Sequence, residues 1–521
     1  MKTIKITTMG IVVAAVSLFP ACGDNFLVQE PRTSLSTRQL FASIDNIQPY
    51  LDGLYFKWRD TRINRKGFFL MLGTDECQQG EYQAKTDAAQ GGLDKYDGFY
   101  EAANTSIAQL WNIRWPVVVQ ATEAISILSP KLATAGDSEK ELLRSFVGQA
   151  SFYKGAVLFE LAAYWGEVPL TQVAGSDIIT TGRKSLPEVY AEIEKNLTTA
   201  GEMLSEKNST SNVRIPTKWA AESLLAKMYM TAPEESGFRD FGKALALLQN
   251  IKAKGGFSLV KNFSDLWDPE KTAGNEAVFT FYFNNVWPDT NELQWYTGTR
   301  ACSSDPNCYI GGYDLILPTV YCYSDATAGG IWEAGDLRKD QSIRYSFIYN
   351  NKQPSSVAGF GEDQLLPHIK KYEDIRIDGV KTFYNSGKNV YYLRYADLLL
   401  MLAECLNETG ATSDAVALVN DEVRKRAWGG TLPDDKKWNP GMSSGEFRIR
   451  IMEERMRELC FEGWRRMDLI RTGNFVTNIS ARNRWAKSNG SIGAHHALYP
   501  IPLVEIKQNP NISDADQNPG Y

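Results

Sequence analysis

The sequence predicts a mainly α-helical protein in which antiparallel helix pairs carry a large, loop-rich and aromatic-rich region with a few short strands. Three observations lead to this fold class. Helical periodicity with capping signals recurs toward both ends of the chain. Several of these helices come in pairs, with alanine at positions of close packing. Between them, residues 255–390 have few helical patterns and are rich in Trp and Tyr.

The helical patterns can be followed in order along the chain. A capping box at 36–39 announces the first helix, and the later helices are expected at 106–128, 139–165, 186–204, 218–231, 240–254, 393–409, 413–427 and 443–461. The pairs 142–165 with 186–204, 218–231 with 240–254, and 393–409 with 413–427 resemble tetratricopeptide units. No clean 34-residue period survives, so the repeats are degenerate. Two strand-like runs are expected at 277–282 and 390–393.

Length and composition are those of a folded globular chain. It has 521 residues, of which 43% are hydrophobic and 23% charged, with a formal net charge of −6. The negative charge argues against nucleic acid as a partner. The three His residues leave little material for His-based metal or acid–base sites, and we predict no metal and no cofactor.

The N-terminus has the layout of an export signal. Lys2 and Lys5 precede an apolar stretch at 9–19, which is too short for a membrane span of about 20 residues. Phe19-Pro20-Ala21-Cys22 then resembles a bacterial lipobox. We therefore predict a lipoprotein signal peptide at 1–21 and lipidation of Cys22, with an ordinary secretory signal as the alternative.

The remaining cysteines suggest no metal site, because no C-x-x-C motif occurs. Cys302 and Cys308 lie in a Ser-, Asp-, Pro- and Asn-containing loop and are candidates for a small disulfide in an exported protein. Cys405 and Cys460 fall in apolar helical patterns, and we expect them to be buried thiols.

Several motifs then resemble one known family. The block 455–473, which contains Arg457-Glu458 and Phe461-Glu462-Gly463-Trp464, is similar to the C-terminal signature of the SusD/RagB family. Further similarities lie at 392–404, 420–427, 164–170, 500–502 and 517–521. The resemblance implies a SusD-like fold in one domain at 22–521, divided into a helical half (22–254), a ligand-facing loop region (255–390) and a C-terminal part (391–521).

The same resemblance implies a role. It predicts an outer-membrane lipoprotein, exposed on the cell surface, that holds an oligosaccharide or polysaccharide for a SusC-like TonB-dependent transporter. A peptide-binding, RagB-like uptake protein is the nearer alternative. The charged residues of the signature are expected to form structural ion pairs rather than an active site.

The chemistry of glycan capture indicates candidate contacts. A sugar ring offers a face of C–H bonds to Trp and Tyr, and a rim of hydroxyls to Asn, Asp, Arg and Gln. Residues 287–300 alternate these types, and residues 78–100 form a second such cluster. The predicted ligand-binding residues are Trp287, Asn291, Trp295, Tyr296, Arg300, Tyr82, Tyr96, Tyr100, Tyr309 and Trp332, with Tyr313 as a further candidate.

No catalytic residue is predicted. The sequence has no H-E-x-x-H, no G-x-S-x-G and no P-loop motif, and Gly359-Phe360-Gly361 lacks the third glycine of a dinucleotide fingerprint. A glycoside hydrolase stays the enzyme-class alternative, because a pair of catalytic carboxylates cannot be recognised without geometry.

Overall fold

The computed structural model describes residues 36–174, 177–271, 273–302, 311–347, 354–376 and 386–521. The chain divides into two units, Met1–Ile47 and Gln48–Tyr521. In the first unit, α1 (Thr37–Leu40) begins with the predicted capping box: Ser36 Oγ accepts the Gln39 backbone N–H, and Gln39 Oε1 accepts the Ser36 N–H. The predicted signal peptide and Cys22 lie outside the described residues.

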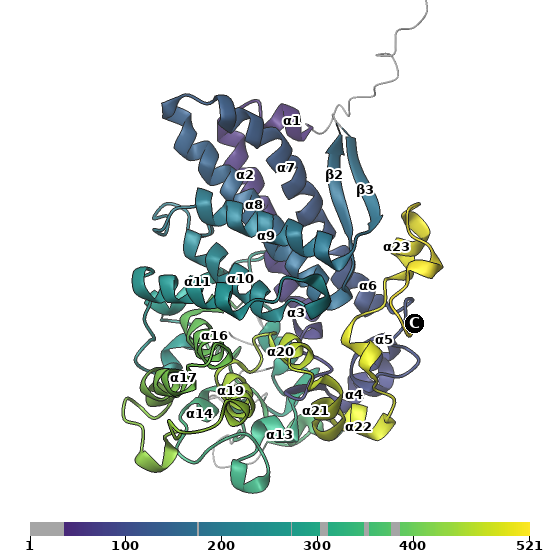
Figure 1. The fold of residues 1–521 in the computed structure, drawn as a ribbon. Coiled ribbons are helices and arrows are strands. Elements are labelled where there is room, and N and C mark those ends of the chain that lie inside the picture. The colour runs from purple at the N-terminus through teal and green to yellow at the C-terminus, as the bar shows by residue number, and fades with distance from the viewer. Residues whose placement is uncertain (1–35, 175–176, 272, 303–310, 348–353, 377–385) are drawn as a thin grey trace, which may run out of the picture. The chain divides into compact units, whose positions relative to one another are not determined.

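Successive antiparallel helices form the scaffold of the second unit (Figure 1). α8 packs against both α7 and α9, α9 against α10, α10 against α11, and α11 against α16, which also contacts α17 and α19. The three predicted helix pairs are therefore confirmed. The bounds of these helices are α7 (Trp115–Thr134), α8 (Asp137–Trp165), α9 (Leu186–Met203), α10 (Lys218–Thr231), α11 (Phe241–Lys254), α16 (Tyr395–Glu408), α17 (Thr412–Leu418) and α19 (Ser444–Leu459).

Small residues explain the close packing of α8 on α9. A Cβ atom added to Gly148 would meet Leu204 Cγ at 2.9 Å, and one added to Gly155 would meet Leu197 at 2.9 Å. The two glycines thus let the helices approach, since protein interiors have no spare volume for extra methyl groups. α8 ends at Gly166, whose φ of 75° suits glycine, as the sequence predicted.

One predicted helix is interrupted. The sequence suggested a continuous helix at 106–128, but the chain forms α6 (Thr105–Asn112) and then α7, with a break at Ile113 and Arg114. Pro116 stands in the first turn of α7, where its missing N–H costs nothing. At the break, the buried Arg114 side chain donates from Nε to Glu160 at 2.9 Å. This tertiary contact was not visible in the periodicity.

Shorter helices complete the second unit. They are α2 (Ile47–Arg59), α3 (Asn64–Phe69), α4 (Glu81–Thr86), α5 (Ala88–Lys95), α12 (Leu293–Thr297), α13 (Val320–Tyr323), α14 (Arg338–Ser342), α18 (Lys425–Ala427), α20 (Arg465–Arg471), α21 (Phe475–Arg482), α22 (Arg484–Asn489) and α23 (Leu503–Gln508). In the part of the chain that is described, no helix combines the length and apolar composition that a membrane span requires.

The described strands form two-stranded antiparallel sheets. β4 (Ala277–Phe281) pairs with β8 (Val390–Arg394), which confirms both predicted strand-like runs. The others are β1 (Cys77–Gln79) with β5 (Ile316–Pro318), β2 (Pro169–Ala174) with β3 (Asp177–Arg183), and β6 (Ile343–Arg344) with β7 (His368–Ile369). The sequence analysis did not predict the β2–β3 hairpin.

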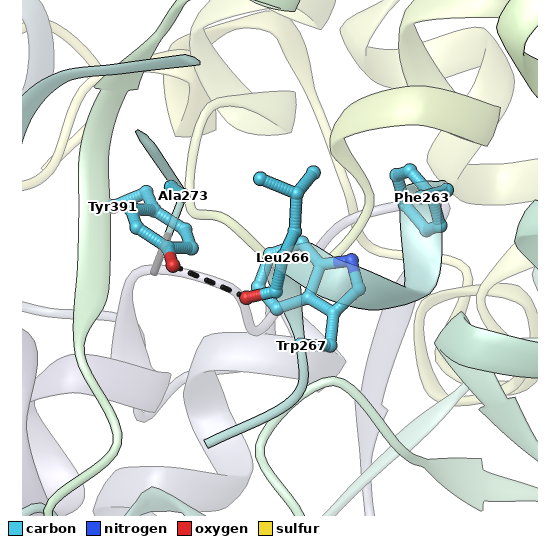
Figure 2. Close-up of a cluster of buried hydrophobic side chains, with 5 residues drawn as sticks. All are labelled: Phe263, Leu266, Trp267, Ala273 and Tyr391. Carbon is cyan, nitrogen blue, oxygen red and sulfur yellow. Dashed lines mark hydrogen bonds between the residues drawn. The ribbon is translucent and has the colours of Figure 1, made fainter. Parts of the chain in front are cut away.

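The loop-rich region between β4 and β8, and the segment before it, have small cores of their own. Figure 2 shows one of them, in which Phe263, Leu266, Trp267 and Ala273 pack with Tyr391 of β8. The Tyr391 hydroxyl donates to the Leu266 carbonyl at 3.2 Å. The contact fastens the chain just after α11 to the sheet that closes the loop-rich region.

A buried ion network joins the loop-rich region to the C-terminal helices. Its centre is Glu458 of α19, which is 0% exposed and accepts hydrogen bonds from Arg338, Arg394 and Arg426. The other members are Lys371, Arg424, Arg457, Glu276, Glu333, Asp336, Glu454 and Glu462. Each charge is paired, which is the condition for burying it. The family signature thus forms structural ion pairs, as expected.

Candidate functional site

The strongest candidate site is a group of rings around one guanidinium. We call Tyr82, Trp295, Tyr313, Phe360 and Arg300 the aromatic platform. Arg300 Cζ lies 4.1 Å from the ring centroid of Phe360, 4.4 Å from that of Tyr313 and 6.0 Å from that of Tyr82. Trp295 extends the group, with its ring centroid 4.4 Å from that of Tyr313. Tyr82 and Phe360 are 5.2 Å apart.

Backbone pairing brings the distant segments of the platform together. Tyr313 N–H donates to the Trp295 carbonyl at 2.8 Å, and Leu315 N–H to the Tyr296 carbonyl at 3.0 Å. β1 pairs with β5, and Gly80 N–H donates to the Leu315 carbonyl at 3.0 Å. These bonds fix α4, which carries Tyr82, beside the segment that carries Tyr313.

The Phe360 loop is tied to α4 by a polar cluster. Glu81 N–H donates to Asp363 Oδ2 at 2.6 Å, and Glu362 N–H donates to Glu81 Oε2 at 3.2 Å. Arg484 holds Asp363 from the other side through both carboxylate oxygens. Bidentate pairs of this kind fix orientation as well as distance, so Phe360 is held next to Tyr82.

Arg300 is anchored on one side only. Its Nη1 donates to the Tyr313 carbonyl and to Asp314 Oδ2, both at 2.6 Å. Burial alone would raise the pKa of Asp314, but its contacts with His368 and Arg300 bring that pKa below its usual value. Arg300 Nη2 has no hydrogen-bond partner among the described residues, although the side chain is only 8% exposed. That nitrogen is itself buried, so this donor is not open to solvent.

The platform offers the two kinds of surface that a sugar requires. Tyr313 is 40% exposed, and Tyr82, Trp295 and Phe360 are half-buried, so parts of these rings face solvent. The rings can cover the C–H faces of a sugar, and the phenolic hydroxyls of Tyr82 and Tyr313 can exchange hydrogen bonds with its hydroxyls. Among the described residues, no group of three or more His, Cys, Asp or Glu side chains could hold a metal ion.

Of the predicted ligand residues, Tyr82, Trp295 and Arg300 lie in the platform, together with the further candidate Tyr313. Sequence reasoning missed Phe360. The sequence signal for it is a Phe between two glycines, Gly359 and Gly361. In the structure both glycines have positive φ, as in a tight turn. As a sequence motif, the triplet resembles only part of a dinucleotide fingerprint.

Other predicted residues are structural in this fold. Asn291 is buried, its Nδ2 donates to the Lys388 carbonyl and its Oδ1 accepts the Leu293 N–H. Tyr296 is buried against Phe68, with ring centroids 5.3 Å apart. Trp332 is fully buried and donates from Nε1 to the Cys322 carbonyl at 2.6 Å. None of these side chains offers a ligand more than a trace of its surface.

Tyr96 and Tyr100 are also interior. Their rings stack 5.2 Å apart, and both hydroxyls accept hydrogen bonds from Arg466. Burial raises the pKa of both hydroxyls, which keeps them protonated. These tyrosines pack in the interior after the end of α5 and are not part of the aromatic platform.

Trp287 is in a different position. Its side chain is 69% exposed on the loop after β4, and none of its ring contacts joins it to the platform in the described structure. Tyr309 and Cys308 lie outside the described residues, so the predicted Cys302–Cys308 disulfide stays a prediction. Cys405 and Cys460 are buried free thiols, as predicted.

Comparisons with known proteins agree with the architecture. A model of the SusD family matches residues 318–521, and a model described as "Starch-binding associating with outer membrane" matches residues 75–230. A SusD-like protein P2 from Formosa agariphila is 26% identical over the whole of both chains. The starch-binding protein SusD from Bacteroides thetaiotaomicron is 24% identical over 86% of this chain and 87% of its own.

A solved structure shares the fold. It is described as a laminarin binding SusD-like protein and superposes with a TM-score of 0.71 at 20% identity, covering 92% of this chain and 99% of its own. The mainly helical architecture with short paired strands is thus common to both chains, and the prediction of this fold class is confirmed.

Proposed function

Because this chain belongs to the SusD family, we propose that it binds glycans at the outer membrane and captures them on the aromatic platform without cleaving them. One observation carries the choice of site: partly exposed rings that come from four separate segments surround one guanidinium. That combination matches the mixed apolar and hydroxyl-rich surface of a sugar.

The relatives support this ligand class. The starch-binding SusD and the laminarin-binding SusD-like protein both bind glucose polymers by name, and this chain is similar to both over most of its length. We propose a neutral oligosaccharide as the first ligand to test. The platform lies on loops and short helices, which is where binding residues are expected on a rigid scaffold.

The test is a binding screen with platform variants. Affinity gel electrophoresis is run against laminarin, starch, fructan and plant cell-wall polysaccharides, with a peptide panel measured in parallel. We expect Trp295→Ala and Tyr313→Ala each to weaken glycan binding about two- to thirteenfold, since ring stacking contributes about 0.5–1.5 kcal/mol. The control is Phe99→Ala, which removes an exposed ring elsewhere on the chain.

The outcomes separate the competing functions. Equal binding by the platform variants and the Phe99→Ala control would move the site elsewhere. Binding of peptides but of no glycan would favour a peptide-uptake protein. Release of reducing sugar by the purified wild-type protein would restore the hydrolase alternative. Thermal melting of each variant distinguishes lost contacts from lost folding, because Tyr313 is partly exposed and contributes little to the core.

We further propose that the protein is lipid-anchored through Cys22 on the cell surface and works with a SusC-like TonB-dependent transporter. The lipobox-like sequence before Cys22 supports the anchor, and family membership supports the partner. Affinity isolation from the native outer membrane in mild detergent should recover a TonB-dependent barrel with this chain. Repeated recovery of this chain alone would count against the partnership.

A further inference from the structure

We infer that the protein has a second glycan-binding site, in a cavity that shares no residue with the aromatic platform. The cavity has a volume of about 760 Å³ and lies between the start of α7 and the chain at α23. We call it the amide pocket. Its lining is Asn112, Trp115, Pro116, Val119, Gln120, Glu505, Gln508, Asn509, Pro510 and Asn511. The inference rests on the proposed function, because it extends glycan binding to a second place.

The volume suits a small ligand, since such sites usually measure about 300–1,000 Å³. In Figure 1, α23 is well separated in the view from α4, which carries Tyr82 of the platform. A single sugar residue therefore cannot occupy the platform and the amide pocket at the same time.

One wall of the pocket is apolar and rigid. Trp115 is half-buried, and its ring centroid lies 5.2 Å from that of the fully buried Trp111. Trp111 is itself fixed, because its Nε1 donates to Glu505 at 3.2 Å. Pro116 and Val119 continue this wall. A held indole of this kind offers a flat face to the C–H side of a sugar at little cost in side-chain entropy.

Other residues of the lining are polar and already ordered. Glu505 Oε2 accepts from Trp111, and its Oε1 accepts from Asn509 Nδ2 at 2.9 Å. Asn509 also donates to the Thr181 carbonyl at 3.2 Å. Both carboxylate oxygens thus point in fixed directions, and each keeps a lone pair for a hydroxyl donor.

Two side-chain amides of the lining are open to a ligand. Within the described residues, the side chains of Asn112 and Gln508 make no hydrogen bond, and both are exposed. An amide presents both donors and an acceptor, so these groups can match the alternating character of sugar hydroxyls.

The charge of the lining narrows the ligand class. The residues that line the amide pocket include one carboxylate, Glu505, and no Lys or Arg. A carboxylate without a lining cation disfavours uronic acids and sulfated sugars, because like charges repel. We therefore assign the pocket to a neutral hexose segment, with the second site strengthening retention of a polysaccharide through multivalent binding.

The test counts bound sugars. Polysaccharides are first screened by gel retardation, and native mass spectrometry then uses laminarihexaose and maltohexaose with the wild-type protein. We expect two bound hexasaccharides at saturation. The Trp295→Ala variant should keep the amide-pocket ligand, and the Asn112→Ala/Gln508→Ala variant should keep the platform ligand. Both amides are exposed, so the double variant should fold normally; Asn208→Ala is the matched control.

Retention on the polysaccharide gel gives the second measurement. The Asn112→Ala/Gln508→Ala variant should bind at least threefold more weakly than the Asn208→Ala control, and Trp115→Ala more weakly still. A single bound hexasaccharide in the wild-type protein, or equal retention of the double variant and the control, would overturn the second site and leave the platform intact. If no polysaccharide retards the wild-type protein, the proposed function fails and this inference fails with it.

Discussion

Replacing Glu458 with Gln should strongly destabilise the fold. Glu458 is fully buried and pairs with three guanidinium groups, those of Arg338, Arg394 and Arg426. Each cation keeps another partner after the change: Arg338 keeps Asp336, Arg394 keeps Glu462, and Arg426 keeps Glu276. The loss is therefore that of one buried ion, about 3–5 kcal/mol, rather than three times that value.

The free energy of unfolding is measured by urea titration with Trp fluorescence and far-UV circular dichroism. Coincident transitions from the two probes check that unfolding is two-state. The matched control is Glu446→Gln on the same helix, whose partner Arg450 is about half exposed and 3.0 Å away. That pair should contribute at most about 1 kcal/mol. If the two variants differ by less than about 1 kcal/mol, the buried ion network does not hold the loop-rich region to the C-terminal helices.

Three further outcomes are expected. The charges of Arg338 and its neighbours outweigh burial and lower the pKa of Glu454 to about 2, so its stabilising effect is complete above about pH 4.5 and is lost as the pH falls toward 2. An acid titration of unfolding free energy that stays flat over this window would contradict the assignment. Trp332→Ala should lower stability by about 3–5 kcal/mol, whereas Trp287→Ala should leave the melting temperature nearly unchanged. Cys22→Ala should yield a folded protein that no longer fractionates with the outer membrane; continued fractionation with the membrane would exclude the lipid anchor.

The scaffold could be predicted because its signals are local. Periodic apolar residues, capping boxes and Gly166 at the end of α8 indicate helices without knowledge of their partners. The break at Arg114 had one local signal, Pro116, which cannot continue a preceding helix; the contact of Arg114 with Glu160 could not be read from the sequence. The β2–β3 hairpin was missed although Gly175-Ser176 between its strands is a two-residue hairpin signal in the sequence.

The candidate site was only partly predictable, because its members meet through long-range contacts. Trp295 and Tyr296 are neighbours with similar chemistry, and the sequence could not separate them. In the structure Trp295 meets Tyr313, whereas Tyr296 packs on Phe68 in the interior. Composition identified the right segment, but the assignment of each ring to platform or core depends on where α12 sits against α3 and β5.

The pairing of β4 with β8 has a consequence for how such proteins diversify. Phe281 is opposite Val390 in this sheet, so the loop-rich segment leaves and re-enters the scaffold at adjacent points. A segment with neighbouring ends can be exchanged between homologues as a cassette, with little demand on the helices around it. The exchanged segment must, however, carry cations at the places of Arg338 and Lys371. These two side chains pair with the buried carboxylates Glu458 and Glu462 of the C-terminal part. Ligand preference can then change by exchange of this one segment, while the helical scaffold is inherited intact.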